Sequence, residues 1–185
     1  LARRNTVNSD LKILDLCCGS GVIAVVLALE LRQQVTAVDL SHEAITIARE
    51  NSQRHQVEGS ISFIQADLFN GFVKKKPFSL IVSNPPYVRS DDIISNLEPE
   101  VACYEPEIAL NGGMTGLDLI TRINEDLADM LDYGGDFFME IGAAQGQTIQ
   151  SMFVEQDSRQ VYESIELYTD YSGRDRVIHV RRKEQ

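Results

Sequence analysis

The sequence has few cysteines and no long apolar run. Three cysteines occur in 185 residues, two of them adjacent (Cys17, Cys18) and one remote (Cys103), which predicts no disulfide framework. No spacing of cysteine or histidine resembles a metal site, so we expect no bound metal. The longest apolar run, residues 22–29, is too short to span a bilayer, and no signal peptide is visible. These absences predict a cytoplasmic protein without a membrane segment.

An excess of positive charge is also missing. The chain has 28 acidic and 17 basic residues, which gives a net charge of −11. Proteins that bind nucleic acid need a basic face for the phosphates, so we expect no direct nucleic-acid partner for this chain. The length suits a single domain over residues 1–185, large enough to bury a core.

Strand and helix patterns alternate along the chain. Strands are expected at residues 12–16, 35–39, 61–64, 78–82, 136–140, 162–168 and 176–180, and helices at 22–31, 41–55, 117–131 and 145–154. This alternation predicts an α/β fold whose parallel sheet has helices on both faces. The last two strands are too closely connected for a parallel crossover, so an antiparallel hairpin is expected there. Residues 88–116 are interpreted as a long irregular connection, which is usually functional.

The stretch Asn84-Pro85-Pro86-Tyr87 follows a buried strand. The prolines end strand pairing, and ligands of open α/β sheets bind beyond the carboxyl ends of strands. Asn84 would therefore point into that crevice. Its side-chain oxygen and the Pro85 carbonyl can accept the two N–H bonds of a planar –NH₂ group, with Tyr87 against the flat face. We interpret the four residues as the catalytic site.

A glycine turn after the first strand predicts a nucleotide-like cofactor. Gly19, Gly21 and Ala24 fit the pattern G-x-G-x-x-A, and Asp39 follows at the end of the second strand, where it can accept from ribose hydroxyls. Alone, this pattern also fits a nicotinamide or flavin nucleotide. Asp15 and Asp67 add carboxylates, which suit a cationic cofactor better than a pyrophosphate. Asp67 could accept from an adenine amine, with Leu68 or Phe69 against the ring.

These motifs together resemble the Rossmann-like S-adenosylmethionine-dependent methyltransferases and, more narrowly, the peptide-chain release factor glutamine methyltransferases. Further matching stretches are residues 97–101, 104–106, 112–113 with 116–118, 140–142 and 173–176. The resemblance implies a mostly parallel seven-stranded sheet with a C-terminal antiparallel hairpin, and methyl transfer from S-adenosyl-L-methionine to the side-chain amide of a glutamine in a release factor. The cofactor-binding residues that it implies are Asp15, Cys17, Gly19, Gly21, Asp39, Leu40, Asp67, Leu68 and Asn84.

Two features depart from that family. Cys17 and Cys18 replace its usual small residues before the glycine turn, and we interpret both as packing residues. Family members also carry an N-terminal helical domain that binds substrate, so the resemblance makes this chain a catalytic-domain fragment. Three alternatives stay open: a methyltransferase that acts on a base amine of RNA or DNA, a nicotinamide-nucleotide oxidoreductase, and a non-catalytic binding module.

Overall fold

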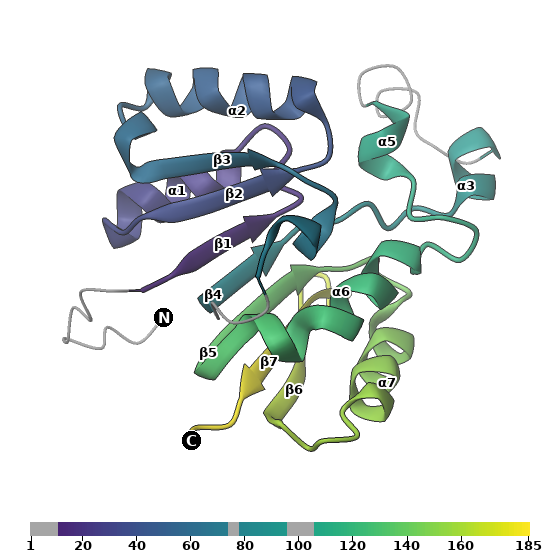
Figure 1. Ribbon diagram of the computed structural model, residues 1–185. Helices are drawn as coiled ribbons and strands as arrows, with labels where there is room; N and C mark the ends of the chain where they lie inside the picture. Colours follow the sequence, from purple (N-terminus) through teal and green to yellow (C-terminus); the bar gives the residue numbers. More distant parts are fainter. Residues whose placement is uncertain (1–10, 74–77, 96–105) are drawn as a thin grey trace.

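A single sheet runs through the computed structural model, which describes residues 11–73, 78–95 and 106–185 (Figure 1). Within these ranges seven strands lie in the order β3-β2-β1-β4-β5-β7-β6. The strands β1 to β5 pair in parallel, whereas β7 is antiparallel to both β5 and β6. Their bounds are β1 Ile13–Leu16, β2 Val35–Asp39, β3 Ile61–Gln65, β4 Phe78–Ser83, β5 Leu131–Glu140, β6 Tyr162–Thr169 and β7 Asp175–Arg182. The predicted α/β class and the C-terminal hairpin are confirmed.

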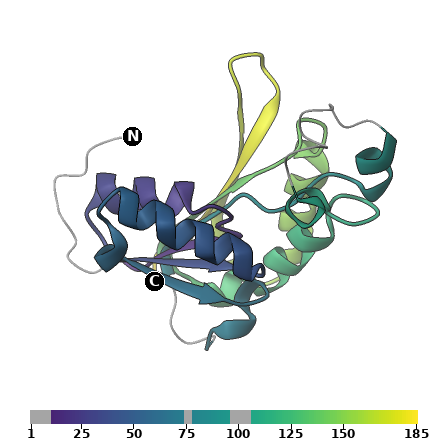
Figure 2. The same ribbon diagram turned by 90° about the horizontal axis from the view of Figure 1, so that it is seen from above.

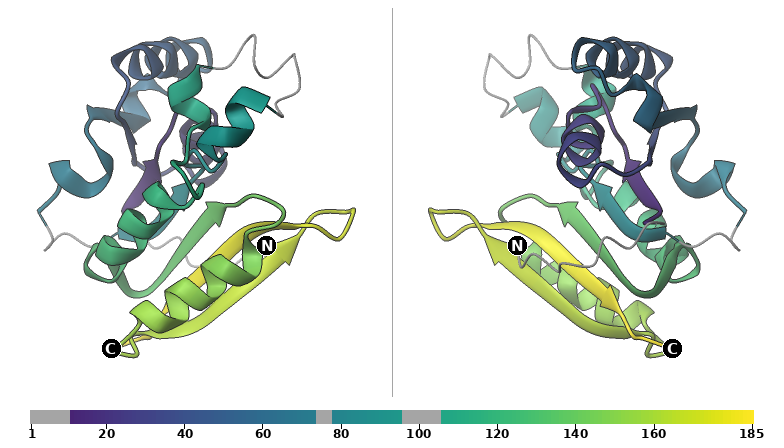
Figure 3. Two further views of the ribbon diagram at one scale, coloured as in Figure 1. Left: turned by 90° about the vertical axis from the view of Figure 1, so that its right-hand side faces the viewer. Right: turned by 90° about the vertical axis from the view of Figure 1, so that its left-hand side faces the viewer.

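Helices cover both faces of this sheet (Figure 3). Helices α1 (Val22–Leu31) and α2 (His42–Arg54) pack on one face against β1, β2 and β3, and α6 (Asp118–Met130) and α7 (Gly146–Gln156) lie on the other. Shorter helices are η1 (Glu58–Ser60), η2 (Leu68–Gly71), α3 (Ser90–Ser95) and α5 (Glu107–Leu110). Among the described residues, no helix is long and apolar enough to cross a membrane.

The two hydrophobic cores arise from the alternation of side chains along the strands. On β1, Ile13 belongs to the core beneath α1 and α2, while Leu14 and Leu16 belong to the core beneath α6 and α7. Successive side chains of a strand point to opposite faces, and a central strand of a covered sheet is apolar on both. All four residues of β1 are buried, which holds the functional end of this strand rigidly.

The start of β5 differs most from the sequence prediction. Strand β5 begins at Leu131, five residues before the predicted start at Asp136, and Gly134 and Gly135 lie within it. The register against β4 shifts between Phe78 and Leu80, so the glycines sit beside an irregularity of the pairing. Glycine is common at such irregularities because it has no side chain to pack.

The described residues of the connection, 88–95 and 106–116, contain more regular structure than predicted. The connection contains α3 and α5, and Val88 forms a parallel bridge with Asn111. Two of its family-like stretches, residues 97–101 and 104–105, lie outside the described residues. The bridge brings the two ends of the connection together directly after Tyr87, so this segment lies over the end of β4.

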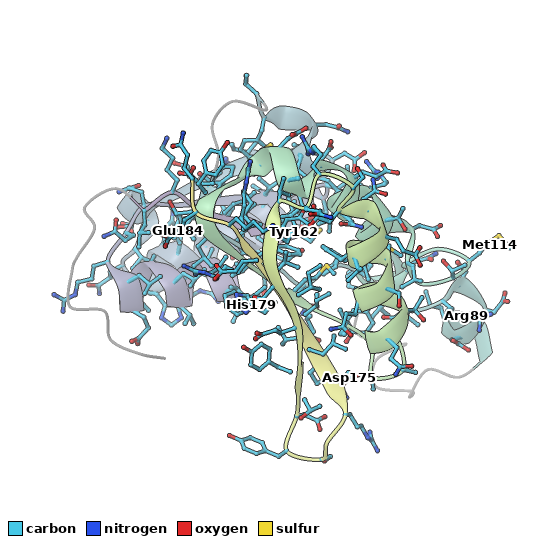
Figure 4. The ribbon with its side chains drawn as sticks, turned by 90° about the horizontal axis from the view of Figure 1, so that it is seen from below. Arg89, Met114, Tyr162, Asp175, His179 and Glu184 are labelled. Atoms are coloured by element: carbon cyan, nitrogen blue, oxygen red, sulfur yellow. The ribbon has the colours of Figure 1, made fainter. Side chains whose placement is uncertain are left out.

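The β6–β7 hairpin projects from the rest of the molecule (Figure 2). Its tip is held by Asp170, whose carboxylate accepts hydrogen bonds from the backbone N–H groups of Ser172 and Arg174. Figure 4 shows Asp175 along this hairpin and His179 nearer the sheet. His179 lies on β7, which has β5 on one side and β6 on the other. Its side chain is only 13% exposed, and its ring stacks on Phe138 at a centroid distance of 4.3 Å.

We predict that Gly21→Ala destabilises the fold by about 2 kcal/mol or more. Gly21 has a φ of +78° at the N-terminal cap of α1, and a Cβ there would lie 2.8 Å from the Cβ of Ala48 on α2. A left-handed conformation costs a non-glycine residue roughly 1–2 kcal/mol, and the overlap adds to this. The measurement is the urea midpoint. Gly59→Ala is the control, because a Cβ there meets nothing within 4 Å; equal midpoints for the two variants would contradict the prediction.

Candidate active site

The site lies where the order of the parallel strands reverses. Strand β1 is flanked by β2 on one side and β4 on the other, and Leu16 lies opposite both Val38 and Ser83. The residues that follow these three positions are Cys17, Asp39 and Asn84. Such a reversal leaves a crevice beyond the carboxyl ends of the strands, where ligands of open α/β sheets bind.

Asp39 fixes the glycine turn. One of its carboxylate oxygens accepts from the backbone N–H of Gly19 at 2.8 Å, and the other accepts from the N–H of Ser41 at 2.9 Å. A carboxylate has about four acceptor positions, so further positions remain for a ligand. A Cβ on Gly19 would meet nothing within 4 Å, so open space lies beside the turn. Leu40, next to Asp39, is 53% exposed.

Asp15 is enclosed beneath this turn. Its side chain is fully buried, and its Oδ2 accepts from the backbone N–H of Ala24 in the first turn of α1 at 2.8 Å. Its Oδ1 is buried and has no hydrogen-bond partner among the described residues. Burial raises the pKa of the Asp15 carboxyl to about 7; the bond from Ala24 opposes this rise, and the negative charge of Asp39 adds to it.

The adjacent cysteines are packing residues. Cys17 has a φ of +60° between β1 and the glycine turn and packs against the core beneath α6 and α7, whereas Cys18 is buried on the opposite side of the sheet. Burial, with the nearby carboxylates, raises the pKa of the Cys17 thiol to about 12 and also raises that of Cys18. Both thiols therefore stay protonated near neutral pH and are poor nucleophiles.

Asp67 is held by a residue that sequence reasoning missed. Its Oδ2 accepts from the Nη2 of Arg122 on α6 at 2.7 Å. The backbone N–H of Ala66 donates to the carbonyl of Asp39 at 3.0 Å, which places this turn beside the second strand. Leu68 and Phe69 have buried side chains, 7% and 4% exposed. These side chains contribute to the core, so we expect any ligand contact of Leu68 to come from its backbone.

A cavity of about 220 Å³ adjoins all four residues of the predicted catalytic stretch. Asn84 is exposed, and its side chain forms no hydrogen bond with a described residue, whereas Pro85 is buried. The cavity is lined by Asn84, Pro85, Pro86, Tyr87, Val88, Ala109, Leu110 and Glu140. The structure therefore brings the catalytic prediction together in one concave site with a free amide at its wall.

Residues from β5 and the turn after it hold Tyr87. The Tyr87 hydroxyl donates to Oε1 of Glu140 at 3.0 Å, and the Tyr87 carbonyl accepts from the side chain of Gln145 at 3.0 Å. The role of Gln145 carried no recognisable sequence signal. Glu140 did have one, because it ends a strand at the edge where the other site residues lie.

Comparison with known proteins found similar sequences and similar folds. Residues 1–113 match the model of a family described as "Methyltransferase small domain". A protein named "Release factor glutamine methyltransferase" from Thermodesulfovibrio yellowstonii is 37% identical over 178 residues, which are 96% of this chain and 61% of the relative. A protein of the same name from Lactococcus lactis is 36% identical over 174 residues, which are 93% of this chain and 61% of that relative.

A solved structure described as a methyltransferase from Pyrococcus furiosus has a TM-score of 0.66 with this chain. It is 17% identical, and the match covers 96% of this chain and 79% of that one. At this identity the likeness supports the fold alone. The chain spans less than two thirds of the length of the two relatives above.

We predict that Asp15→Asn changes how stability depends on pH. In the folded wild type the carboxyl keeps its proton up to a pH of about 7, whereas in the unfolded chain it ionises near pH 4. The unfolded state therefore loses its proton first, and this group lowers wild-type stability as pH rises from about 4 to about 7. The asparagine variant has no such loss.

The measurement is the free energy of unfolding of both proteins at pH 4.5, 6 and 8. The free energy of unfolding of the variant minus that of the wild type should increase as pH rises, by up to about 4 kcal/mol. Taking a difference cancels the contribution of the other carboxylates. A difference that stays constant with pH would show that Asp15 ionises normally in the folded chain.

Proposed function

We propose that this chain, which belongs to the methyltransferase small domain family, transfers a methyl group from S-adenosylmethionine to the side-chain amide nitrogen of a glutamine in a peptide-chain release factor. The observation that carries the proposal is the concave site with the exposed side chain of Asn84 at the carboxyl end of β4. The names of the relatives support the choice of acceptor.

The cofactor site is assigned to the glycine turn and its carboxylates. Asp39 accepts from the ribose hydroxyls with the positions that its two backbone bonds leave free. Asp67 presents Oδ1 to the adenine amine, because Arg122 occupies Oδ2. Asp15 orients the turn through the N–H of Ala24. Several carboxylates within one crevice fit a ligand that carries sulfonium and ammonium charges.

The acceptor amide is assigned to the cavity beside Asn84. When bound, S-adenosylmethionine supplies an electrophilic methyl group. The Asn84 side-chain oxygen and the Pro85 carbonyl accept the two N–H bonds of the substrate amide, which raises the electron density on its nitrogen and fixes its direction of attack. Tyr87, held by Glu140 at its hydroxyl, lies against the flat face of the amide. Positioning of this kind can lower a barrier by about 7–11 kcal/mol.

No strong general base is required of these residues. The nitrogen becomes positive as the methyl group arrives, so its proton becomes acidic and can leave to water. This matters because Glu140, the carboxylate of the cavity, already accepts from Tyr87. In this scheme Glu140 orients Tyr87 and takes no proton from the substrate.

The proposed protein substrate is tested by measuring methyl transfer from labelled S-adenosylmethionine. The enzyme in this assay is the full natural protein that contains this chain. The acceptors, assayed side by side, are a release factor, the same factor with the glutamine of its Gly-Gly-Gln loop changed to alanine, tRNA and DNA. Label on the unchanged release factor alone is the expected result. Label on either nucleic acid would replace the proposed substrate by an exocyclic base amine and leave the assignment of Asn84 intact.

Two substitutions separate acceptor binding from cofactor binding. Asn84→Ala should lower kcat for methyl transfer by on the order of 100-fold or more, as expected for a group that orients and polarises the reacting atoms, while the affinity for S-adenosylhomocysteine stays within about threefold. Asp39→Ala should instead weaken S-adenosylhomocysteine about tenfold or more, through loss of charged hydrogen bonds. Calorimetry measures both affinities. Undiminished transfer by Asn84→Ala would reduce Asn84 to a turn residue.

A further inference from the structure

One side chain joins three segments, one of which carries Tyr87 of the cavity wall. Gln145 lies just before α7, and its Oε1 accepts from the backbone N–H of Gly142 at 2.9 Å. Its Nε2 donates to the carbonyl of Tyr87 at 3.0 Å and to the carbonyl of Gly116 at 3.2 Å. A side-chain amide has two N–H bonds and one oxygen, so both N–H bonds and the oxygen of Gln145 have partners. It touches the predicted catalytic stretch, the turn before α6 and the turn after β5.

The turn before α6 fits closely against Tyr87. Gly116 has a φ of +75°, and a Cβ there would lie 2.5 Å from the Tyr87 carbonyl oxygen and 2.9 Å from the Gln145 amide nitrogen. A Cβ on Gly112 would lie 2.8 Å from the Cα of Tyr87. These positions leave room for backbone only. The two glycines therefore let the turn come within reach of the same amide that holds Tyr87.

Backbone hydrogen bonds also join the residues that follow Tyr87 to residues 110–113. Val88 N–H donates to the Leu110 carbonyl at 2.9 Å, Gly112 N–H donates to the Val88 carbonyl at 2.8 Å, and Ser90 N–H donates to the Gly113 carbonyl at 3.0 Å. Arg89 and Met114, both exposed, lie on the same side of the molecule (Figure 4). Leu110 also lines the cavity, so the position of Tyr87 and the shape of the acceptor site depend on the same contacts.

We infer that Gln145 is a positioning residue for methyl transfer: its amide locks Tyr87 to the Gly112–Gly116 turn and so sets the geometry of the acceptor cavity. It acts through Tyr87 and touches no reacting group. The inference rests on the proposed function for its catalytic consequence, but the locking itself is a property of the free protein. Within the described part of the chain the hydrogen bonds of Gln145 reach Gly142, Tyr87 and Gly116 and not the glycine turn, so we expect its effect on the acceptor side.

The chemistry of the amide provides a specific test. In Gln145→Leu both donors are lost at every pH. In Gln145→Glu the bond from Gly142 can remain, but a carboxylate oxygen faces the two carbonyl oxygens that the amide had bound. Their repulsion, with partial burial, raises the pKa of the introduced carboxyl above its ordinary value of about 4.3. When protonated, this carboxyl has one O–H and can again donate to one carbonyl.

The first measurement is amide hydrogen exchange of the free protein, expressed as protection factors so that the intrinsic pH dependence cancels. In Gln145→Leu, protection of the Val88 and Gly112 amides should fall about tenfold or more, while protection at Ile81 and Phe137 in the core stays unchanged. In Gln145→Glu the same loss should appear at pH 8 and shrink as pH falls to 5.5. The matched control is Gln150→Leu, which also removes a glutamine bond to a backbone carbonyl, that of Ile165 at 3.0 Å, but within α7.

The second measurement is methyl transfer by the same variants. Gln145→Leu should lower kcat/KM for the acceptor about tenfold or more, with S-adenosylhomocysteine affinity within about twofold of wild type. The ratio of kcat/KM for Gln145→Glu to that of wild type should rise as pH falls, whereas the ratio for Gln145→Leu should stay constant. Gln150→Leu should leave both quantities unchanged.

The outcomes separate the two proposals. Unchanged protection at Val88 and Gly112 in Gln145→Leu overturns the locking role. Lost protection with normal transfer overturns the positioning role. If protection and kcat/KM depend on pH equally in Gln145→Leu and Gln145→Glu, the inference is also overturned, because hydrogen-bond donation by the side chain at position 145 then has no effect. If wild type methylates none of the four acceptors, the proposed function fails, and the exchange measurement still decides whether Gln145 locks the turn.

Discussion

The parallel pairing of β1 with both β2 and β4 is the constraint on which the site depends. Leu16 lies opposite Val38 and Ser83, so three strands end at one level and Cys17, Asp39 and Asn84 follow together. A one-residue slip in either pairing would turn the side chains of that strand to the opposite face. The burial of β1 on both faces opposes such a slip, because it would expose apolar side chains or bury polar ones. Packing of the central strand therefore fixes functional geometry.

Most of the sheet could be predicted from the sequence because its strands are short apolar runs between clear breakers. The predicted strand at residues 61–64 differs from β3 only by Gln65 at its end. Prediction failed where one physical signal had two meanings. Gly134 and Gly135 are typical of a boundary and of an irregularity within a strand, and only pairing with β4 and β7 decides between them. The order within residues 88–116 depends on the contact between Val88 and Asn111, which is remote in sequence.

The same division holds for the candidate site. The stretch from Asn84 to Tyr87 was recognisable because each residue type carries its own chemistry and the four are contiguous, and they line one cavity. Arg122 and Gln145 were not predictable, because each acts across more than fifty residues, on Asp67 and on Tyr87. A glutamine or an arginine on a helix or at its end has the same sequence signature whether it faces solvent or holds a distant loop. Sequence thus indicates the groups that meet a ligand, whereas the groups that orient them emerge from the fold.

Asp15 relates the fold to the proposed cofactor. Its Oδ1 is buried and has no partner among the described residues, and Asp39 adds negative charge nearby, so the folded protein favours a proton there. A cationic ligand in the crevice would compensate the same charge and lower the pKa of Asp15, because an opposite charge favours the ionised form. Binding would then release a proton near neutral pH, and the ligand would stabilise the folded chain in return. A pyrophosphate would do the reverse, by adding negative charge beside a carboxyl that is already difficult to ionise. The electrostatics of Asp15 therefore favour a sulfonium cofactor over a dinucleotide, which the glycine pattern alone could not decide.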